Sequence, residues 1–231
     1  MIKNILLDLD DTLLDFHKAE AVALKTTLEK FGINPTAKTL ARYSAINVQL
    51  WEALERGELE REEVLTQRFS ILFNELGESV SSEKARDTYE NLLGIGHYFI
   101  PGAPELLEDI HEKYSLYLVS NGTAAVQATR IESAKIAKYF KGMFISQNVG
   151  FNKPHIEFFS RCFAEIPNFC HEETVIIGDS LSSDIKGGNN AKIKTIWFNP
   201  AKKPQREGIT VNYEISNLSA LPPLLEQIGR E

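Results

Sequence analysis

Cysteine is scarce in this chain. Only Cys162 and Cys170 occur among its 231 residues, and they do not form a CxxC pair. So few thiols argue against a disulfide framework, and zinc sites normally take several closely spaced cysteine or histidine ligands. The five histidines are scattered, and none is paired with a second ligand by its spacing. We therefore expect two reduced, buried cysteines.

Positive charge and long apolar runs are lacking as well. The formal net charge is -7, whereas surfaces that bind nucleic acid are normally basic. No apolar run approaches the length of roughly 20 residues that spans a bilayer, and Asp8 interrupts the amino-terminal segment too early for a secretory signal. These absences predict a cytoplasmic protein with no nucleic-acid or membrane partner. They leave room for an anionic substrate, because a local metal ion and a lysine can outweigh the total charge.

What the chain does have is an acidic cluster directly after an apolar run. Residues 5–7 are Ile-Leu-Leu, and Asp8, Asp10 and Asp11 follow within four positions. A short apolar run of this kind is typical of a strand buried on both faces, as in a parallel sheet. Ligands of open α/β sheets bind at the carboxyl ends of the strands. Three crowded carboxylates repel one another, so we expect a cation and a positively charged side chain beside them.

Residues 16–93 carry apolar side chains at helical spacing and show no strand pattern. Four amphipathic helices are predicted: one over 16–31, one with its apolar face at 40–54, one with its apolar face at 64–76, and one from 81 or 82 to about 94–96. Short turns with glycine between such helices favour a bundle. Because the first strand belongs with the later sheet, we expect a core domain of residues 1–15 and 97–231 and an inserted helical domain of residues 16–96.

From residue 101 onward, helical and strand patterns alternate. Strands are predicted at 115–119, 143–146, 174–177 and 194–198, with a short edge strand at 213–215. Helices are predicted at 101–113, 124–137, 154–166, 182–191 and 221–228. The third of these would begin at Pro154, since proline is favoured at the first helical position. Such alternation predicts an α/β fold with a doubly wound parallel sheet.

Polar residues follow the predicted strands at one edge of this sheet. They are Asp8, Asp10, Ser120, Asn121, Lys153, Asp179 and Asp184. Each motif alone has an ordinary interpretation, because paired aspartates and Gly-Asp-Ser also occur in turns and helix caps, and a lone Lys-Pro is common on surfaces. Their convergence on a single edge is what favours a functional site.

These residues resemble the four motifs of the haloacid dehalogenase-like (HAD) phosphohydrolases. Residues 8–12 are similar to the Asp-x-Asp-x-Thr motif, Ser120 to the second motif, Lys153-Pro154 to the third, and residues 178–184 to the acidic fourth. The resemblance spans nearly the whole chain and implies a C1-type cap at residues 16–96. Residues 10–16 and 184–191 are most similar to bacterial pyrimidine 5′-nucleotidases. Lys192 departs from this branch, which has glycine there, and would be strained by about 1 kcal/mol in a left-handed conformation.

The resemblance implies a Mg²⁺-dependent phosphomonoester hydrolase that forms an aspartyl-phosphate. The implied substrate is a small phosphorylated metabolite, above all a nucleoside 5′-monophosphate. Asp8 would be the nucleophile and Asp10 the general acid and base. Lys153 would balance the charge of Asp8 and the phosphate, whose other oxygens would meet Ser120 and the amides around Asn121. The implied ligands of Mg²⁺ are Asp8, the backbone carbonyl of Asp10, Asp179 and Asp184.

Other functions stay open at this point. A phosphatase or phosphomutase for another metabolite, such as a sugar phosphate, would keep both acids. A dehalogenase needs the nucleophile but not Asp10, and a non-catalytic phosphate-binding protein does not need the complete acid set. Substrate choice is expected to come from the inserted helices. The candidates there to line the substrate space are Phe16, His17, Tyr43, Asn47 and Trp51.

Overall fold

The structure is a computed structural model, and it describes residues 1–229. Within these residues a six-stranded sheet has the order β3-β2-β1-β4-β5-β6, and all neighbouring strands are parallel. The doubly wound α/β class is therefore confirmed. The strands are β1 (Asn4–Leu7), β2 (Ser115–Ser120), β3 (Gly142–Ile145), β4 (Thr174–Gly178), β5 (Lys194–Phe198) and β6 (Tyr213–Ile215).

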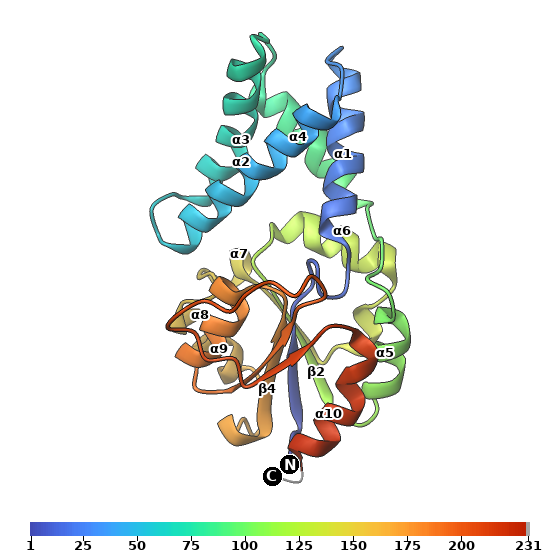
Figure 1. Cartoon of the computed structure of the whole chain (residues 1–231), viewed down its shortest axis with the longest axis vertical. Helices are drawn as coiled ribbons and strands as arrows, with labels where there is room; N and C mark the ends of the chain where they lie inside the picture. Colours follow the sequence, from blue (N-terminus) through green and yellow to red (C-terminus); the bar gives the residue numbers. More distant parts are fainter. Residues whose placement is uncertain (230–231) are drawn as a thin grey trace.

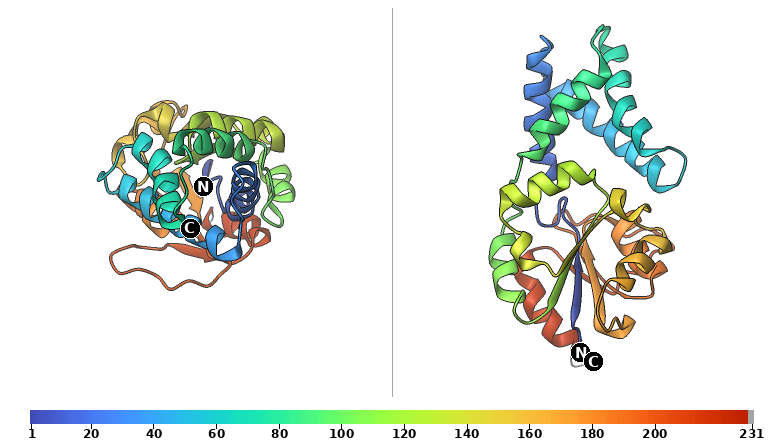
Figure 2. Two further views of the ribbon diagram at one scale, coloured as in Figure 1. Left: turned by 90° about the horizontal axis from the view of Figure 1, so that it is seen from above. Right: turned by 180° about the vertical axis from the view of Figure 1, so that it is seen from behind.

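The helices form two sets (Figure 1). Four of them lie beyond the carboxyl ends of the strands, as both side views show (Figures 1 and 2), and we call them the α1–α4 bundle: α1 (Phe16–Lys30), α2 (Ala37–Glu55), α3 (Arg61–Leu76) and α4 (Ser82–Gly94). The others lie in the sheet-containing part: α5 (Ala103–Ile110), α6 (Ala124–Ala134), α7 (Ser146–Val149), α8 (Ile156–Ala164), α9 (Lys186–Asn190) and α10 (Leu221–Ile228).

Successive residues of β1 serve opposite layers of the fold. Ile5 and Leu7 pack in the cluster that contains Leu107 of α5 and Leu225 of α10, whereas Leu6 packs in the cluster that contains the α8 aromatics. All four residues of β1 are buried. A strand covered on both faces has no polar side, which is why residues 5–7 of β1 form an uninterrupted apolar run after Asn4.

One hydrophobic cluster comes mostly from the α1–α4 bundle, with Val126 of α6 packed into it. Leu28, Tyr43, Phe69 and Tyr89 belong to it, and no buried residue of the two large clusters on the sheet does. The division into a core of residues 1–15 and 97–231 and an insertion of residues 16–96 stays a prediction. The last two residues of the predicted core, 230–231, lie outside the described part of the chain.

The helix predicted over 154–166 does not begin at Pro154, so this expectation is wrong. α8 begins at Ile156, and the Lys153–Pro154 peptide bond is cis. The Lys153 amide donates to Asn121 Oδ1 at 2.8 Å, and Asn190 Nδ2 donates to the Pro154 carbonyl at 2.9 Å. Partners distant in sequence thus hold this turn, and local proline preference could not reveal them.

The segment predicted as one helix over 182–191 divides in two. A π-helical turn spans Leu181–Ile185, and α9 follows it directly. The wider turn contains Asp184, whose carboxylate lies against the end of β4. Such π segments are frequent at functional sites.

Both cysteines are free thiols. Cys162 is buried, as expected, but Cys170 is only partly buried and its Sγ lies 3.0 Å from Glu172 Oε2. The expectation of two buried thiols is therefore wrong for Cys170. Across residues 1–229, no helix combines the length and the apolar character needed to cross a membrane.

Lys192 adopts a left-handed conformation, with a φ of 55°. Because a side chain there is strained by about 1 kcal/mol, we expect Lys192→Gly to raise the free energy of unfolding, although glycine's freedom in the unfolded chain offsets part of the gain. Urea denaturation measures this change. The matched control is Lys25→Gly, at an exposed right-handed position within α1, which should lower stability by about 1 kcal/mol. A loss of stability in both variants would contradict the strain.

Candidate active site

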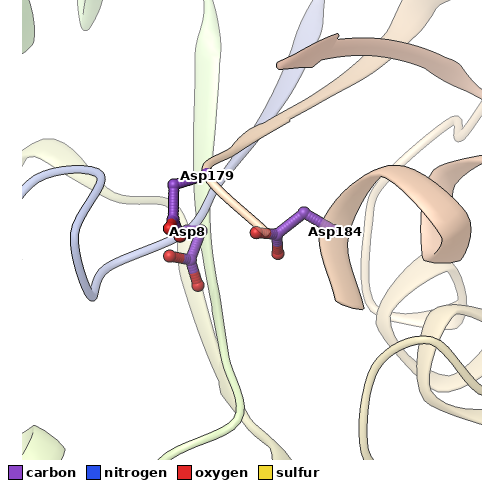
Figure 3. A group of neighbouring side chains, drawn as sticks. All are labelled: Asp8, Asp179 and Asp184. Carbon is purple, nitrogen blue, oxygen red and sulfur yellow. The ribbon is translucent and has the colours of Figure 1, made fainter. Parts of the chain in front are cut away.

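Three carboxylates, which we call the acid cluster, meet at the carboxyl edge of the sheet. Asp8 directly follows β1, Asp179 follows β4, and Asp184 lies in the π-helical turn after it. One oxygen from each lies within 4.8 Å of the others, and Figure 3 shows the three groups turned toward a common space. β1 and β4 are neighbours at the point where the chain changes direction across the sheet. Such a switch point is where open α/β sheets bind their ligands.

The sequence around β4 explains how Asp184 comes so close. A Cβ atom on Gly178 would lie 2.1 Å from Asp184 Oδ2, so only glycine leaves room for this carboxylate. The Ser180 amide donates to the same oxygen at 3.1 Å. Ser180 Oγ also accepts from the Ser183 amide at 3.2 Å, which starts the turn. Gly178 and Ser180 thus bring the second acid of the motif back to the end of the strand.

Lys153 lies between two of these acids. Its Nζ donates to Asp8 Oδ1 at 2.7 Å and to Asp184 Oδ1 at 2.6 Å, and also to the Val119 carbonyl at 2.9 Å. The side chain is 2% exposed. Asn121 fixes its backbone, since Nδ2 donates to the Lys153 carbonyl at 2.8 Å and Oδ1 accepts from its amide. A buried ammonium therefore bridges carboxylates from β1 and from the turn after β4.

The site is short of positive charge. Burial raises the pKa of Asp8 to about 8, with Lys153 opposing this rise and Asp184 and Asp10 adding to it. Burial and the neighbouring carboxylates of Asp8 and Asp184 also raise the pKa of Asp179 well above its usual value. A divalent cation would supply the missing charge, and a set of carboxylate oxygens is what hard cations such as Mg²⁺ bind. The residues present therefore fit a metal site.

Asp10 lies apart from these three acids. Among residues 1–229, the group of mutually close carboxylates contains Asp8, Asp179 and Asp184 but not the side chain of Asp10. Two residues of α6 hold that side chain instead: Gln127 Nε2 donates to Oδ2 at 2.6 Å, and Arg130 Nη1 donates to Oδ1. Asp8 and Asp10 nevertheless line the same cavity. Asp8 thus belongs to the acid cluster, whereas Asp10 lines the cavity with a carboxylate that Gln127 and Arg130 hold in place.

Two of the three predicted phosphate contacts, Ser120 and Asn121, have different surroundings. Ser120 is buried at the end of β2, and its Oγ accepts from Gln127 Nε2 at 2.7 Å and from the Gly122 amide at 3.3 Å. The side-chain amide of Asn121 is occupied by Lys153 and by Ser183 Oγ at 3.1 Å. The side chain of Asn121 therefore orients Lys153, and the backbone amide of Asn121 is left to contact a ligand.

Sequence reasoning missed Gln127, Arg130, Glu55 and Arg61. The first two follow Ser120 and lie three positions apart on α6, a spacing that places them on one helix face and could have indicated them. Glu55 accepts from Asn121 Nδ2 and Ser182 Oγ, each at 3.2 Å. Arg61 donates to Ser146 Oγ and to Asn152 Oδ1, each at 2.7 Å. Both contacts join the bundle to the sheet edge, and no sequence pattern marks them.

A cavity of about 390 Å³ joins the acid cluster to the α1–α4 bundle. Four of the five residues expected to line this space do line it: Phe16, His17, Asn47 and Trp51. The expectation is wrong for Tyr43, which is fully buried within the bundle. Its ring packs 5.0 Å from Phe69 and 5.5 Å from Tyr89, centroid to centroid. Tyr43 and Asn47 are one turn apart on α2, but only Asn47 lines the cavity.

Residues 5–198 match the family model of the haloacid dehalogenase-like hydrolases. The chain belongs to this family. It is 40% identical to the HAD-hydrolase YfnB of Bacillus subtilis over 96% of this chain and 95% of that protein. The crystal structure of YfnB bound to magnesium superposes with a TM-score of 0.93, covering 97% of this chain and 98% of that one.

Two further relatives of this HAD hydrolase have more specific names. Pyrimidine 5′-nucleotidase PynA of Streptococcus pneumoniae is 35% identical over 97% of this chain and 95% of its own length. The glyceraldehyde 3-phosphate phosphatase of Pyrococcus furiosus is 29% identical over 100% of this chain and 94% of its own. The resemblance drawn from the motifs is therefore confirmed at the level of the family.

Removing Lys153 should leave two buried carboxylates without their shared counter-charge. We expect Lys153→Met to lower the free energy of unfolding by about 3–5 kcal/mol in chelator-treated protein. Chemical denaturation measures the loss. The matched control is Lys113→Met, which breaks an exposed ion pair of 3.0 Å with Asp109 and should change stability little. Equal effects of the two substitutions would mean that Lys153 does not balance the acids.

Proposed function

We propose that this HAD hydrolase is a Mg²⁺-dependent phosphomonoester hydrolase that forms an aspartyl-phosphate, with nucleoside 5′-monophosphates as substrates. The observation that carries the proposal is the position of Asp8, which contacts Lys153, belongs to a cluster of three acids and lines a cavity of about 390 Å³. The relatives support it, since two are named as phosphatases of nucleotides or of a triose phosphate. A cytoplasmic location, expected from the composition, is part of the same proposal.

Asp8, Asp179, Asp184 and the backbone carbonyl of Asp10 would hold the metal ion. Bound there, Mg²⁺ neutralises phosphate oxygens and carboxylates together. Asp8 attacks phosphorus, so that a bond from its carboxylate oxygen to phosphorus forms as the ester bond to the leaving oxygen breaks. Lys153 holds Asp8 in place and offsets the negative charge of the entering phosphate.

Asp10 gives a proton to the leaving alkoxide and later takes one from the water that attacks the aspartyl-phosphate. That second attack breaks the bond between Asp8 and phosphorus, releases inorganic phosphate and restores the carboxylate. Gln127 and Arg130 hold Asp10 by one carboxylate oxygen each. Ser120 and the backbone amides near Asn121 hold the phosphate oxygens that do not react.

Residues 16–96 act as a cap in this proposal. The lining of the cavity combines acids of the sheet edge with Trp51 and Val48 of the bundle. A triose phosphate has no flat apolar part to place against these side chains, whereas a nucleoside has one. The structure therefore favours nucleotides over small sugar phosphates, which remain the second candidate because of the Pyrococcus furiosus relative.

Replacing the nucleophile should abolish turnover without unfolding the chain. In Asp8→Asn the amide oxygen can still accept from Lys153 Nζ, and the NH2 group that replaces Oδ2 can donate to Thr12 Oγ1, but the amide cannot form the acyl phosphate. We expect kcat for p-nitrophenyl phosphate to fall at least about a thousandfold, with an unchanged circular dichroism spectrum. The matched control is Asp11→Asn, since asparagine tolerates the φ of 57° at that position. Substantial activity in Asp8→Asn would remove Asp8 from its role.

Chelation separates the proposed reaction from the alternatives. With Mg²⁺ we expect phosphate release from p-nitrophenyl phosphate, its loss in excess EDTA, and its recovery when Mg²⁺ is restored, because the acid cluster repels a phosphate dianion without the ion. Colorimetric phosphate assay measures all three states. Release that ignores the chelator would contradict the metal site, and no release from any phosphomonoester would favour a binding protein.

A further inference from the structure

Each helix of the α1–α4 bundle contributes one polar side chain to a connected network. Asn47 Nδ2 of α2 donates to Glu20 Oε1 of α1 at 2.8 Å. Arg68 of α3 donates from Nη1 to Asn47 Oδ1 at 3.3 Å and from Nη2 to Glu90 Oε1 of α4 at 3.1 Å. Glu20, Asn47 and Arg68 are each less than 5% exposed. We call these four residues the polar network.

The polar network lines the same cavity as the acid cluster. Buried charges rarely stabilise a fold more than apolar side chains of similar size would, because desolvation offsets their attraction. Packing of four helices alone therefore gives no reason to prefer Glu20, Asn47 and Arg68 over leucines. A cavity that must hold a polar ligand gives such a reason, since its wall needs hydrogen-bonding groups at defined positions.

Glu20 is the buried carboxylate of the polar network, and it has spare capacity to accept from a ligand. A carboxylate has about four acceptor sites, and the side-chain partners that bond to it are Asn47 and Ser44. Arg68, by contrast, directs its guanidinium to Asn47, to Glu90 and to the Leu65 carbonyl at 3.3 Å. What the polar network offers the cavity is therefore a hydrogen-bond acceptor that Asn47 holds in place.

An apolar wall completes the cavity. Its lining includes Phe16, Val48, Trp51 and Leu93, and Val48 is 47% exposed despite its apolar side chain. A ligand that matches the acid cluster, the apolar wall and the Glu20 acceptor has an anionic group, a flat apolar body, and an edge that carries an N–H donor. Ribose phosphates lack the last two features, whereas nucleotides have all three.

We infer that Glu20 is a specificity-determining residue that accepts a hydrogen bond from an N–H group on the base of the nucleotide, with Asn47 orienting its carboxylate. The inference rests on the proposed function and deepens it, because it names the part of the substrate that the bundle recognises. In uridine 5′-monophosphate this donor is N3–H, the one N–H group of its base. The two carboxylates of Glu20 and Glu90 outnumber the one positive charge of Arg68, so this end of the cavity disfavours a second phosphate.

The test compares Glu20→Gln with the wild type on uridine 5′-monophosphate and ribose 5-phosphate. Glutamine keeps an oxygen that accepts from Asn47 Nδ2. The NH2 group that replaces the second oxygen is a donor, so it cannot accept from the N–H group of the base. We expect KM for uridine 5′-monophosphate to rise about tenfold or more, while KM and kcat for ribose 5-phosphate stay within about twofold. 3-Methyluridine 5′-monophosphate, which has no N3–H, should bind the wild type as weakly as the variant binds the unmodified nucleotide.

Thr27→Val on the same helix is the matched control. Thr27 is fully buried, its hydroxyl bonds to the Ala23 carbonyl at 2.8 Å, and it is not among the residues that line the cavity. Its replacement should alter neither substrate's kinetics. Equal losses on both substrates in Glu20→Gln, or an unchanged KM for uridine 5′-monophosphate, would overturn the inference. Failure of the proposed function is distinct, because the wild type would then release no phosphate from uridine 5′-monophosphate.

Discussion

The ammonium of Lys153 is the contact on which the site depends. It lies 2.7 Å from Asp8 and 2.6 Å from Asp184, and it is buried at the point where β1 and β4 end. One positive charge among three carboxylates leaves a deficit, and burial increases its cost. The same deficit makes the space attractive to a hard divalent cation. The fold thus holds together, at one edge of a sheet, groups that repel each other.

The rest of the chain arranges itself around that edge. Gly178 admits Asp184, Asn121 fixes the backbone of Lys153, and α6 holds Asp10 through Arg130 and Gln127. The α1–α4 bundle lies over the same edge, where Arg61 and Glu55 join it to the sheet-containing part. The acids of the sheet edge and the polar side chains of the bundle therefore line one cavity, although they come from different parts of the fold.

Much of the fold was predictable because its local signals agree with its tertiary structure. Alternating strand and helix patterns predicted all six strands, and the buried run before Asp8 predicted a strand covered on both faces. The errors lie where distant partners decide: Pro154 does not start α8 because Asn121 and Asn190 hold the turn. Tyr43 and Asn47 differ in exposure to the cavity although both lie on α2, and periodicity cannot tell an inner bundle face from a ligand-facing one.

The sequence by itself determined the α/β class, the position of the acids at strand ends and the resemblance to HAD hydrolases, because strand ends and motif spacing are local properties of the chain. Tertiary structure alone decided that Asp10 pairs with Arg130, that Asn121 serves Lys153, and that Glu20, Asn47, Arg68 and Glu90 meet beside the cavity. Those contacts join residues on different elements. Their geometry depends on how helices and strands pack, which no single stretch of sequence encodes.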